Sequence, residues 1–151
     1  TDLRALHGCD SRKTIVRECT PMSANEKTIS ERVIGCAFTV SNTLGAGFLE
    51  AVYENALALE LAQTGPAFER QKALDVSYKG AVVGHYIADL VIEQRLIVEI
   101  KALSSITAVH EAQLMNYLQA TGISVGLILN FGTPRLGVKR IVKSYDDSSR
   151  I

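Results

Sequence analysis

The stretch RLIVEIKA (residues 95–102) predicts a buried strand of a sheet. Its leucine, isoleucine and valine residues form a nearly continuous apolar run, which is typical of a strand covered on both faces. Because alternate residues of a strand share a face, Glu99 and Lys101 are expected to point the same way as Ile97. Two charges on one face of a core strand are costly to bury unless they are paired or bind a metal.

Two structural explanations account for these charges on their own: a buried Glu99–Lys101 ion pair, or a strand with one face in water. Asp89 favours a third explanation, because it supplies a second carboxylate at the predicted end of the preceding strand. Two carboxylates beside a lysine suit a hard divalent cation with a positioned water. These three residues therefore form a candidate site.

The composition is that of an ordinary globular domain. The chain has 151 residues, of which 47% are hydrophobic and 21% charged. No apolar run reaches the ~20 residues needed to span a bilayer, and the N-terminal stretch has no apolar signal-peptide core, so we expect a cytoplasmic protein with no membrane partner. Residues 1–21 show no sustained period. We expect them to be weakly ordered or extraneous, before a single domain over residues 22–151.

Cysteine and charge content exclude some classes of protein and leave others open. The three cysteines (Cys9, Cys19 and Cys36) match no zinc or cluster spacing, so we expect reduced thiols. A net charge of zero does not mark a nucleic-acid binder. Residues 131–151 nevertheless carry five basic side chains against two acidic ones. This segment could meet phosphates, although a charge run is most often a solvated face.

Hydrophobic periodicity predicts the order helix, helix, three strands, helix, strand, strand. A first helix ends at the Leu44–Gly47 break; further helices are expected over residues 48–63 and 107–120, and strands over 68–78, 81–93, 95–102, 123–131 and 138–142. Lys79-Gly80 is a hairpin turn, and short turns between the first three strands imply an antiparallel meander. The fold class is therefore α/β, with helices on both faces of one sheet.

Two short motifs lie on predicted helices. Gly47, Glu50 and Tyr53 form a GxxExxY pattern in which the glutamate and tyrosine share one helical face. Alone, this pattern favours a solvated glutamate beside a half-buried tyrosine, and Glu54 is also expected to be solvated. Glu60 is interpreted in the same way.

The second motif is a glutamine and a tyrosine four residues apart, Gln113 and Tyr117, on one face of the later helix. An amide can orient a water or a phosphate oxygen, and a phenol can do so while packing its ring. A QxxxY pattern taken alone is more often a pair of residues on the exposed surface of a helix. His110 and Glu111, which precede the motif, are expected to be surface residues.

In chain order, these features are a glutamate on the first helix pair, an aspartate ending the second strand, ExK on the third strand and QxxxY on the next helix. This ordered set resembles the PD-(D/E)XK nuclease superfamily, especially its RecB-like branch. The GxxExxY run, HEAQLMNYLQATG (residues 110–122) and GLILNFG (residues 126–132) resemble the small bacterial GxxExxY family more closely still. The resemblance covers about residues 26–143. It implies a restriction-endonuclease-like fold, with a central mixed sheet flanked by helices.

The resemblance implies that Asp89 and Glu99 bind Mg²⁺ or Mn²⁺, with the backbone carbonyl of Ile100 as a further ligand. Glu50 matches the helix acid that reaches the metal directly or through water. On independent grounds, carboxylate and carbonyl oxygens suit these hard cations better than zinc. One departure is Ala88, which stands before Asp89 where the superfamily's name has a proline.

Lys101 matches the lysine that orients the attacking water and steadies charge in the transition state, and Gln113 and Tyr117 match residues bordering the site. The implied function is a metal-dependent nuclease, with DNA favoured over RNA as its substrate. Double-strand cutting by a domain with one site would favour a homodimer, and a protein partner could supply further contacts with DNA. The alternative is a non-enzymatic nuclease-fold module that binds nucleic acid or a protein. Three cysteines exclude the four-cysteine iron–sulfur cluster of some RecB-like relatives.

Overall fold

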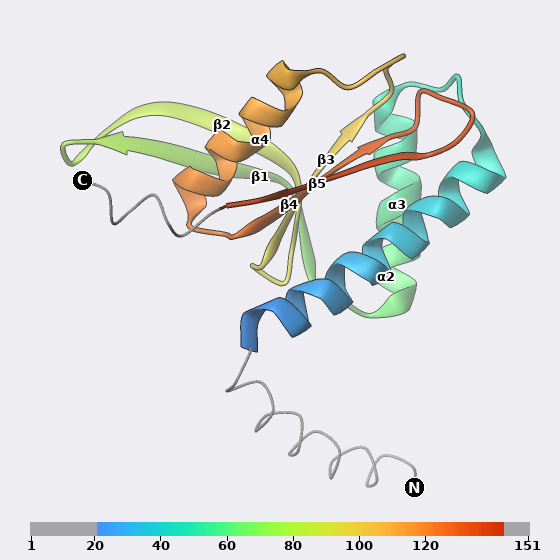
Figure 1. The fold of residues 1–151 in the computed structure, drawn as a ribbon, viewed down its shortest axis with the longest axis horizontal. Coiled ribbons are helices and arrows are strands. Elements are labelled where there is room, and N and C mark those ends of the chain that lie inside the picture. Colours follow the sequence, from blue (N-terminus) through green and yellow to red (C-terminus); the bar gives the residue numbers. More distant parts are fainter. Residues whose placement is uncertain (1–20, 144–151) are drawn as a thin grey trace, which may run out of the picture.

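The computed structural model describes the backbone of residues 21–143 and the side chains of residues 28–143. In chain order its elements are α2 (Pro21–Leu44), α3 (Glu50–Thr64), β1 (Phe68–Tyr78), β2 (Ala81–Ile92), β3 (Leu96–Lys101), α4 (Ala108–Thr121), β4 (Val125–Asn130) and β5 (Gly137–Val142) (Figure 1). This order confirms the order predicted from periodicity. The prediction for residues 1–21 lies, apart from Pro21, outside the described residues.

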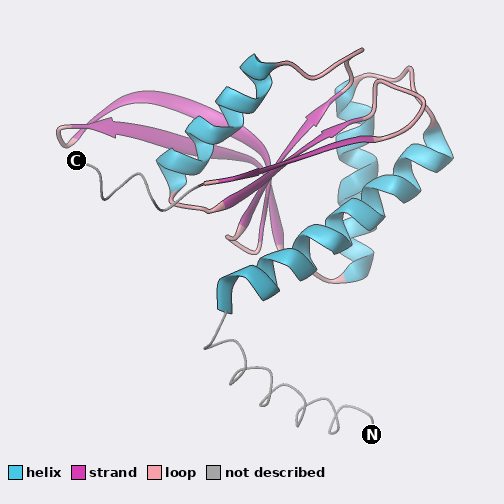
Figure 2. Cartoon of the chain, viewed as in Figure 1, coloured by secondary structure: helices cyan, strands magenta, loops and turns pink. Residues whose placement is uncertain are grey.

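The five strands form one mixed sheet in the order β1-β2-β3-β4-β5 (Figure 2). The predicted antiparallel meander of the first three strands is confirmed. Strand β4 then runs parallel to β3, with α4 in the crossover, and β5 is antiparallel to β4. Lys79 and Gly80 form the expected hairpin turn, and both have positive φ, 52° and 82°, as a type I′ turn requires.

Helices cover both faces of the sheet and bury a separate apolar cluster on each. Helices α2 and α3 cover one face, where Leu57 and Leu61 pack with Val98 of β3. Helix α4 covers the other, where Leu114 packs with Ile97. Strand β3 is thus buried on both faces, as its apolar run predicts. No helix within the described residues is long and apolar enough to cross a bilayer.

The side chains of the β1–β2 hairpin change from one face of the sheet to the other along its length. Leu90 packs in the α2–α3 cluster, whereas Leu74 and Ala88 pack in the cluster under α4. Alternate residues of a regular strand share a face, so Ala88 and Leu90 would lie on the same side of an unbroken β2. The strand therefore turns over between them, at Asp89.

Gln71 of β1 lies opposite Asp89, because the antiparallel register pairs Arg70 with Leu90. Its φ of 51° is in the left-handed region, which few residues other than glycine adopt. Such a residue bends a strand and increases its local twist, as at a β-bulge. The left-handed conformation of Gln71 thus accompanies the change of face in β2.

Asn130 and Gly132 determine how the chain leaves β3. The Asn130 side chain accepts a hydrogen bond from the N–H of Leu103 and donates one to its carbonyl, both at 2.9 Å. The N–H of Phe131 donates to the carbonyl of Lys101 at 2.8 Å. A Cβ atom on Gly132 would collide with the backbone of Leu103. The GLILNFG segment therefore fixes the backbone directly after Lys101.

Two Gly→Ala substitutions are expected to change stability in opposite directions. Gly132→Ala forces Leu103 away and should destabilise the protein by about 1–3 kcal/mol. Gly35→Ala, in α2 where an added Cβ meets no atom within 4 Å, should stabilise it by roughly 0.5–1 kcal/mol through helix propensity. Urea denaturation measures both. Equal stability of the two variants would contradict the close approach at Gly132.

Candidate active site

Asp89 and Glu99 lie where β2 and β3 separate. The last backbone pair between the strands on this side is Leu90 with Val98. Beyond it the N–H of Asp89 donates to Oε2 of Glu99 at 3.1 Å, and the N–H of Ile100 donates to Oδ2 of Asp89 at 2.8 Å. The prediction that Asp89 ends its strand is wrong, because β2 continues to Ile92. Asp89 instead marks the end of pairing with β3.

The carboxyl group of Glu99 is buried, with only 5% of the residue exposed. Burial, and then the neighbouring carboxylate of Asp89, raise the pKa of Glu99 to about 8. The N–H of Asp89 and the charge of Lys101 act in the opposite direction. Burial and a second acid both disfavour the charged form, so this site favours a proton or a cation beside Glu99.

Lys101 is half-buried at the end of β3. Within residues 28–143, no carboxylate oxygen lies within 4.0 Å of its ammonium nitrogen. Lys101 therefore influences Glu99 through a longer-range attraction, which lowers the pKa of Glu99. The described part of the chain does not contain the buried Glu99–Lys101 ion pair that the sequence alone allowed.

Glu50 is the first residue of α3 and is exposed. Its charge raises the pKa of Glu99, as the weakest of the five influences on that group. Among the residues whose side chains are described, no three His, Cys, Asp or Glu side chains are grouped closely enough to hold a metal ion. The structure thus brings Asp89 and Glu99 together but does not place Glu50 in one cluster with them.

Tyr117 of α4 is close enough to the two carboxylates for their charges to act on its hydroxyl. It is 5% exposed, and its ring centroid is 5.7 Å from that of Tyr86. Burial, followed by the charges of Glu99 and Asp89, raises the pKa of the Tyr117 hydroxyl. Gln113 lies one turn earlier on the same helix and is half-buried. The QxxxY pair is therefore not the surface pair that the spacing alone favours.

The Tyr53 side chain links the turn between α2 and α3 to the first turn of α3. It is fully buried rather than half-buried as the isolated motif suggested. Its hydroxyl donates to the carbonyl of Gly45 at 2.6 Å and accepts from the N–H of Phe48 at 3.1 Å. Its ring stacks on Phe131, with centroids 4.7 Å apart. These contacts hold the turn that precedes Glu50.

Glu54 was missed by the sequence interpretation, which placed it in solvent. It is buried, at 9% exposed, and accepts hydrogen bonds from Arg70 at 3.1 Å and from Gln71 at 2.8 Å. The Gln71 amide also donates to Oδ1 of Asp89 at 3.4 Å. Glu54 follows Glu50 by one helical turn, a spacing that could have grouped the two acids.

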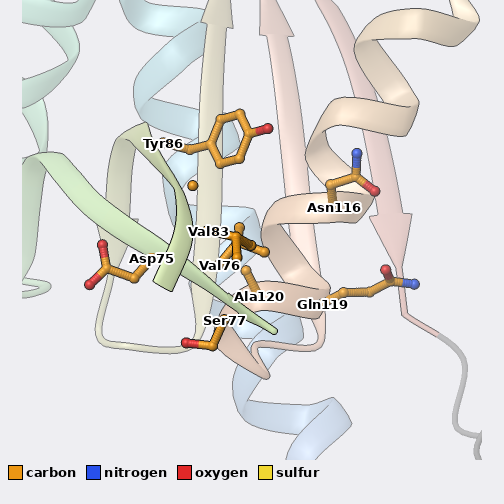
Figure 3. A pocket seen from close by; sticks show the side chains of 9 residues that line it. Asp75, Val76, Ser77, Val83, Tyr86, Asn116, Gln119 and Ala120 are labelled. Carbon is orange, nitrogen blue, oxygen red and sulfur yellow. The ribbon is translucent and has the colours of Figure 1, made fainter. Parts of the chain in front are cut away.

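A pocket of about 490 Å³ lies between the β1–β2 hairpin and α4 (Figure 3). Ser77, Tyr86, Asn116 and Gln119 are among the residues that line it. The site carboxylates are not part of its lining. The pocket is linked to them through the ring contact between Tyr86 and Tyr117.

Comparison with known proteins identifies a family and a fold. A model of the PD-(D/E)XK nuclease superfamily matches residues 27–141. The crystal structure of SSO0001 is similar, with a TM-score of 0.50, 21% sequence identity and a match that covers 66% of this chain and 52% of that chain. The crystal structure of an alkaline exonuclease from Laribacter hongkongensis gives a TM-score of 0.48 and 13% sequence identity, with a match that covers 66% of this chain and 58% of that chain. The chain thus spans little more than half of either structure. No curated protein matches the sequence.

Glu99→Gln is expected to flatten the pH dependence of stability of the metal-free protein. The pKa of Glu99 is about 8 in the folded state against an ordinary 4.5, so the folded protein keeps a proton that the unfolded chain releases. The contribution of this group to stability is therefore greatest below about pH 4.5 and is lost as the pH rises toward 8. The loss should be on the order of a few kcal/mol, since one pKa unit corresponds to about 1.4 kcal/mol.

Urea denaturation of wild type and variant in the presence of a chelator, at a series of pH values, measures this difference. The glutamine keeps an oxygen that can accept from the N–H of Asp89, so the variant should fold. A stability difference that stays constant across the series would contradict a buried, acid-flanked carboxyl at this position.

Proposed function

Because the chain belongs to the PD-(D/E)XK nuclease superfamily, we propose that it is a metal-dependent nuclease that hydrolyses phosphodiester bonds, in DNA rather than RNA. The observation that best supports this proposal is the pairing of Asp89 with Glu99 through two backbone hydrogen bonds at the end of the β2–β3 ladder. Within the superfamily we assign the chain to the GxxExxY family of the RecB-like branch, on its GxxExxY and QxxxY motifs. We also propose that residues 22–151 form a single domain.

The donor groups fit a hard divalent cation, Mg²⁺ or Mn²⁺. Asp89, Glu99 and the backbone carbonyl of Ile100 offer oxygen ligands, which such cations prefer. The raised pKa of Glu99 marks a place where added positive charge is favourable. Glu50 is exposed and bonds to no other described side chain, so its carboxylate is free to turn toward an ion. A bound cation would neutralise phosphate oxygens and lower the pKa of a water.

The remaining proposed residues act on the water and the phosphate. Lys101 has no ion-pair partner among the described residues, so its ammonium is available to orient the attacking water and to steady negative charge in the transition state. The Tyr117 hydroxyl is protonated at neutral pH, as in any tyrosine, and its surroundings raise its pKa further, so it can donate a hydrogen bond. Gln113 would orient a water or a phosphate oxygen beside it. A homodimer would supply a second such site for cutting both strands of a duplex.

Lys101→Met is expected to reduce DNA cleavage by about a hundredfold to a thousandfold, because it removes a charge needed only in the transition state. It should leave Mn²⁺ binding and folding nearly unchanged, since methionine keeps the apolar stem of lysine. Plasmid nicking and single-strand degradation with Mg²⁺ or Mn²⁺, repeated on RNA, measure the rate. Lys79→Met, the same change at the hairpin tip, serves as the control.

A folded Lys101→Met protein that cleaves at the wild-type rate would defeat this assignment. Absence of cleavage by the wild type, with nucleic-acid or protein binding retained, would favour the non-enzymatic module instead.

Asp89→Asn is expected to abolish most of the stabilisation that Mn²⁺ gives to the wild-type protein. A ligand that binds only the folded state stabilises it by about 2.7 kcal/mol at one hundred times its Kd. Asparagine still offers an oxygen to the N–H of Ile100, so the metal-free variant should remain folded. Thermal denaturation with and without Mn²⁺ measures the gain. Asp75→Asn, an exposed aspartate on the same hairpin, is the control. If Mn²⁺ raised the melting temperature of both variants equally, the metal would have to bind elsewhere.

A further inference from the structure

We propose that Gln71 is a positioning residue for the site: Glu54, which is itself bound by Arg70, holds its side chain, and Gln71 orients the carboxylate of Asp89. The inference rests on the proposed function, because it concerns the residue assigned there as a metal ligand. It adds supporting residues on α3 and β1 behind those proposed to bind the metal and the substrate.

The Gln71 amide bridges two carboxylates that belong to different elements. Its Nε2 donates to Oε1 of Glu54 on α3 at 2.8 Å and, over a longer 3.4 Å, to Oδ1 of Asp89 on β2. An amide nitrogen carries two hydrogens, so one group can serve both acceptors.

Glu54 anchors the glutamine and is itself held by Arg70. Oε2 of Glu54 accepts from Nε of Arg70 at 3.1 Å, and Arg70 also donates to Asn55. Both oxygens of Glu54 are thus occupied, and the residue is only 9% exposed. An acid in this state is poorly suited to bind a metal. It is well suited to fix the position of the Gln71 side chain.

The backbone of Gln71 supports a side-chain role. Its φ of 51° is a left-handed conformation in mid-strand, which is unfavourable for any residue with a Cβ. Glycine would adopt the same turn without this cost. A glutamine at this position therefore weakens the strand locally, and what it gains is the amide contact with Glu54 and Asp89.

The consequence for Asp89 is a fixed carboxylate plane. The N–H of Ile100 holds Oδ2 at 2.8 Å, while Gln71 holds Oδ1. Two restraints on different oxygens leave the group little freedom to rotate. Hydrogen bonds to metal-ligating carboxylates of this kind typically change metal affinity or activity by about ten- to a hundredfold.

The test compares two Gln→Gly variants. Gln94 is a matched control: its φ is 57°, and its amide donates to Oε1 of Glu69 at 2.8 Å, in the turn between β2 and β3. Both substitutions relieve a left-handed backbone, but only Gln71→Gly removes the donor to the buried Oε1 of Glu54, so a lower melting temperature is expected for that variant alone. Only Gln71→Gly should weaken Mn²⁺ binding, by about tenfold or more. Titration calorimetry with Mn²⁺ alone, on metal-free protein, measures the affinity.

Gln71→Asn controls for a loss of folding in the glycine variant. Asparagine tolerates the left-handed conformation, but its side chain is one methylene too short to bridge the two acids. It should lose Mn²⁺ affinity to a similar extent. Glu54→Gln leaves one acceptor oxygen for the two donors Arg70 and Gln71, so it should also weaken binding. Its effect should not add to that of Gln71→Gly, because both substitutions disturb the same link.

Variants of Gln71 that bind Mn²⁺ as tightly as Gln94→Gly would overturn the positioning role, and additive losses with Glu54→Gln would overturn the anchor. Failure of the proposed function would look different. A wild-type protein that binds Mn²⁺ but cuts no nucleic acid would refute hydrolysis and leave the positioning role standing, whereas one that binds no Mn²⁺ would refute both.

Discussion

The candidate site depends on an exchange of hydrogen bonds in which two acidic side chains each accept a backbone N–H from the opposite strand. Asp89 and Glu99 thereby replace backbone carbonyls at the point where β2 and β3 part. The backbone of the sheet thus holds one oxygen of each carboxylate. The cost is visible at Glu99, whose pKa is raised by its burial and by its neighbour. The apolar clusters on the two faces of the sheet must offset that cost.

The change of face in the β1–β2 hairpin explains why both helical layers can reach one carboxylate. A regular strand would present Asp89 to one layer only. Because β2 turns over at this residue, Asp89 is linked to α3 through Gln71 and Glu54, and its charge also acts on Tyr117 of α4. A left-handed residue in β1 accompanies this geometry. The local departure from ideal strand structure is therefore part of the site.

The sequence was sufficient for features that depend on local patterns. The apolar run of residues 95–102 predicted a buried strand, the alternation of side chains along a strand predicted the common face of Glu99 and Ile97, and the Lys79-Gly80 turn predicted the hairpin. It failed at Glu54 and Gln71, whose contact joins residues 17 positions apart. Nothing local distinguishes a glutamate saturated by two partners from one in solvent. A left-handed glutamine in a strand has no sequence signature either, since propensity would favour glycine there.

Glu50 and Glu54 show how one helix can supply two acids for different purposes. They are one turn apart, yet Glu50 is exposed while Glu54 is buried and bound through both oxygens. A cation entering the proposed site can recruit the free carboxylate of Glu50 without breaking any hydrogen bond among the described residues. Recruiting Glu54 would require separating it from Arg70 and releasing Gln71. The existing contacts thus favour a division in which Glu54 maintains the arrangement around Asp89 and Glu50 is the acid that can move.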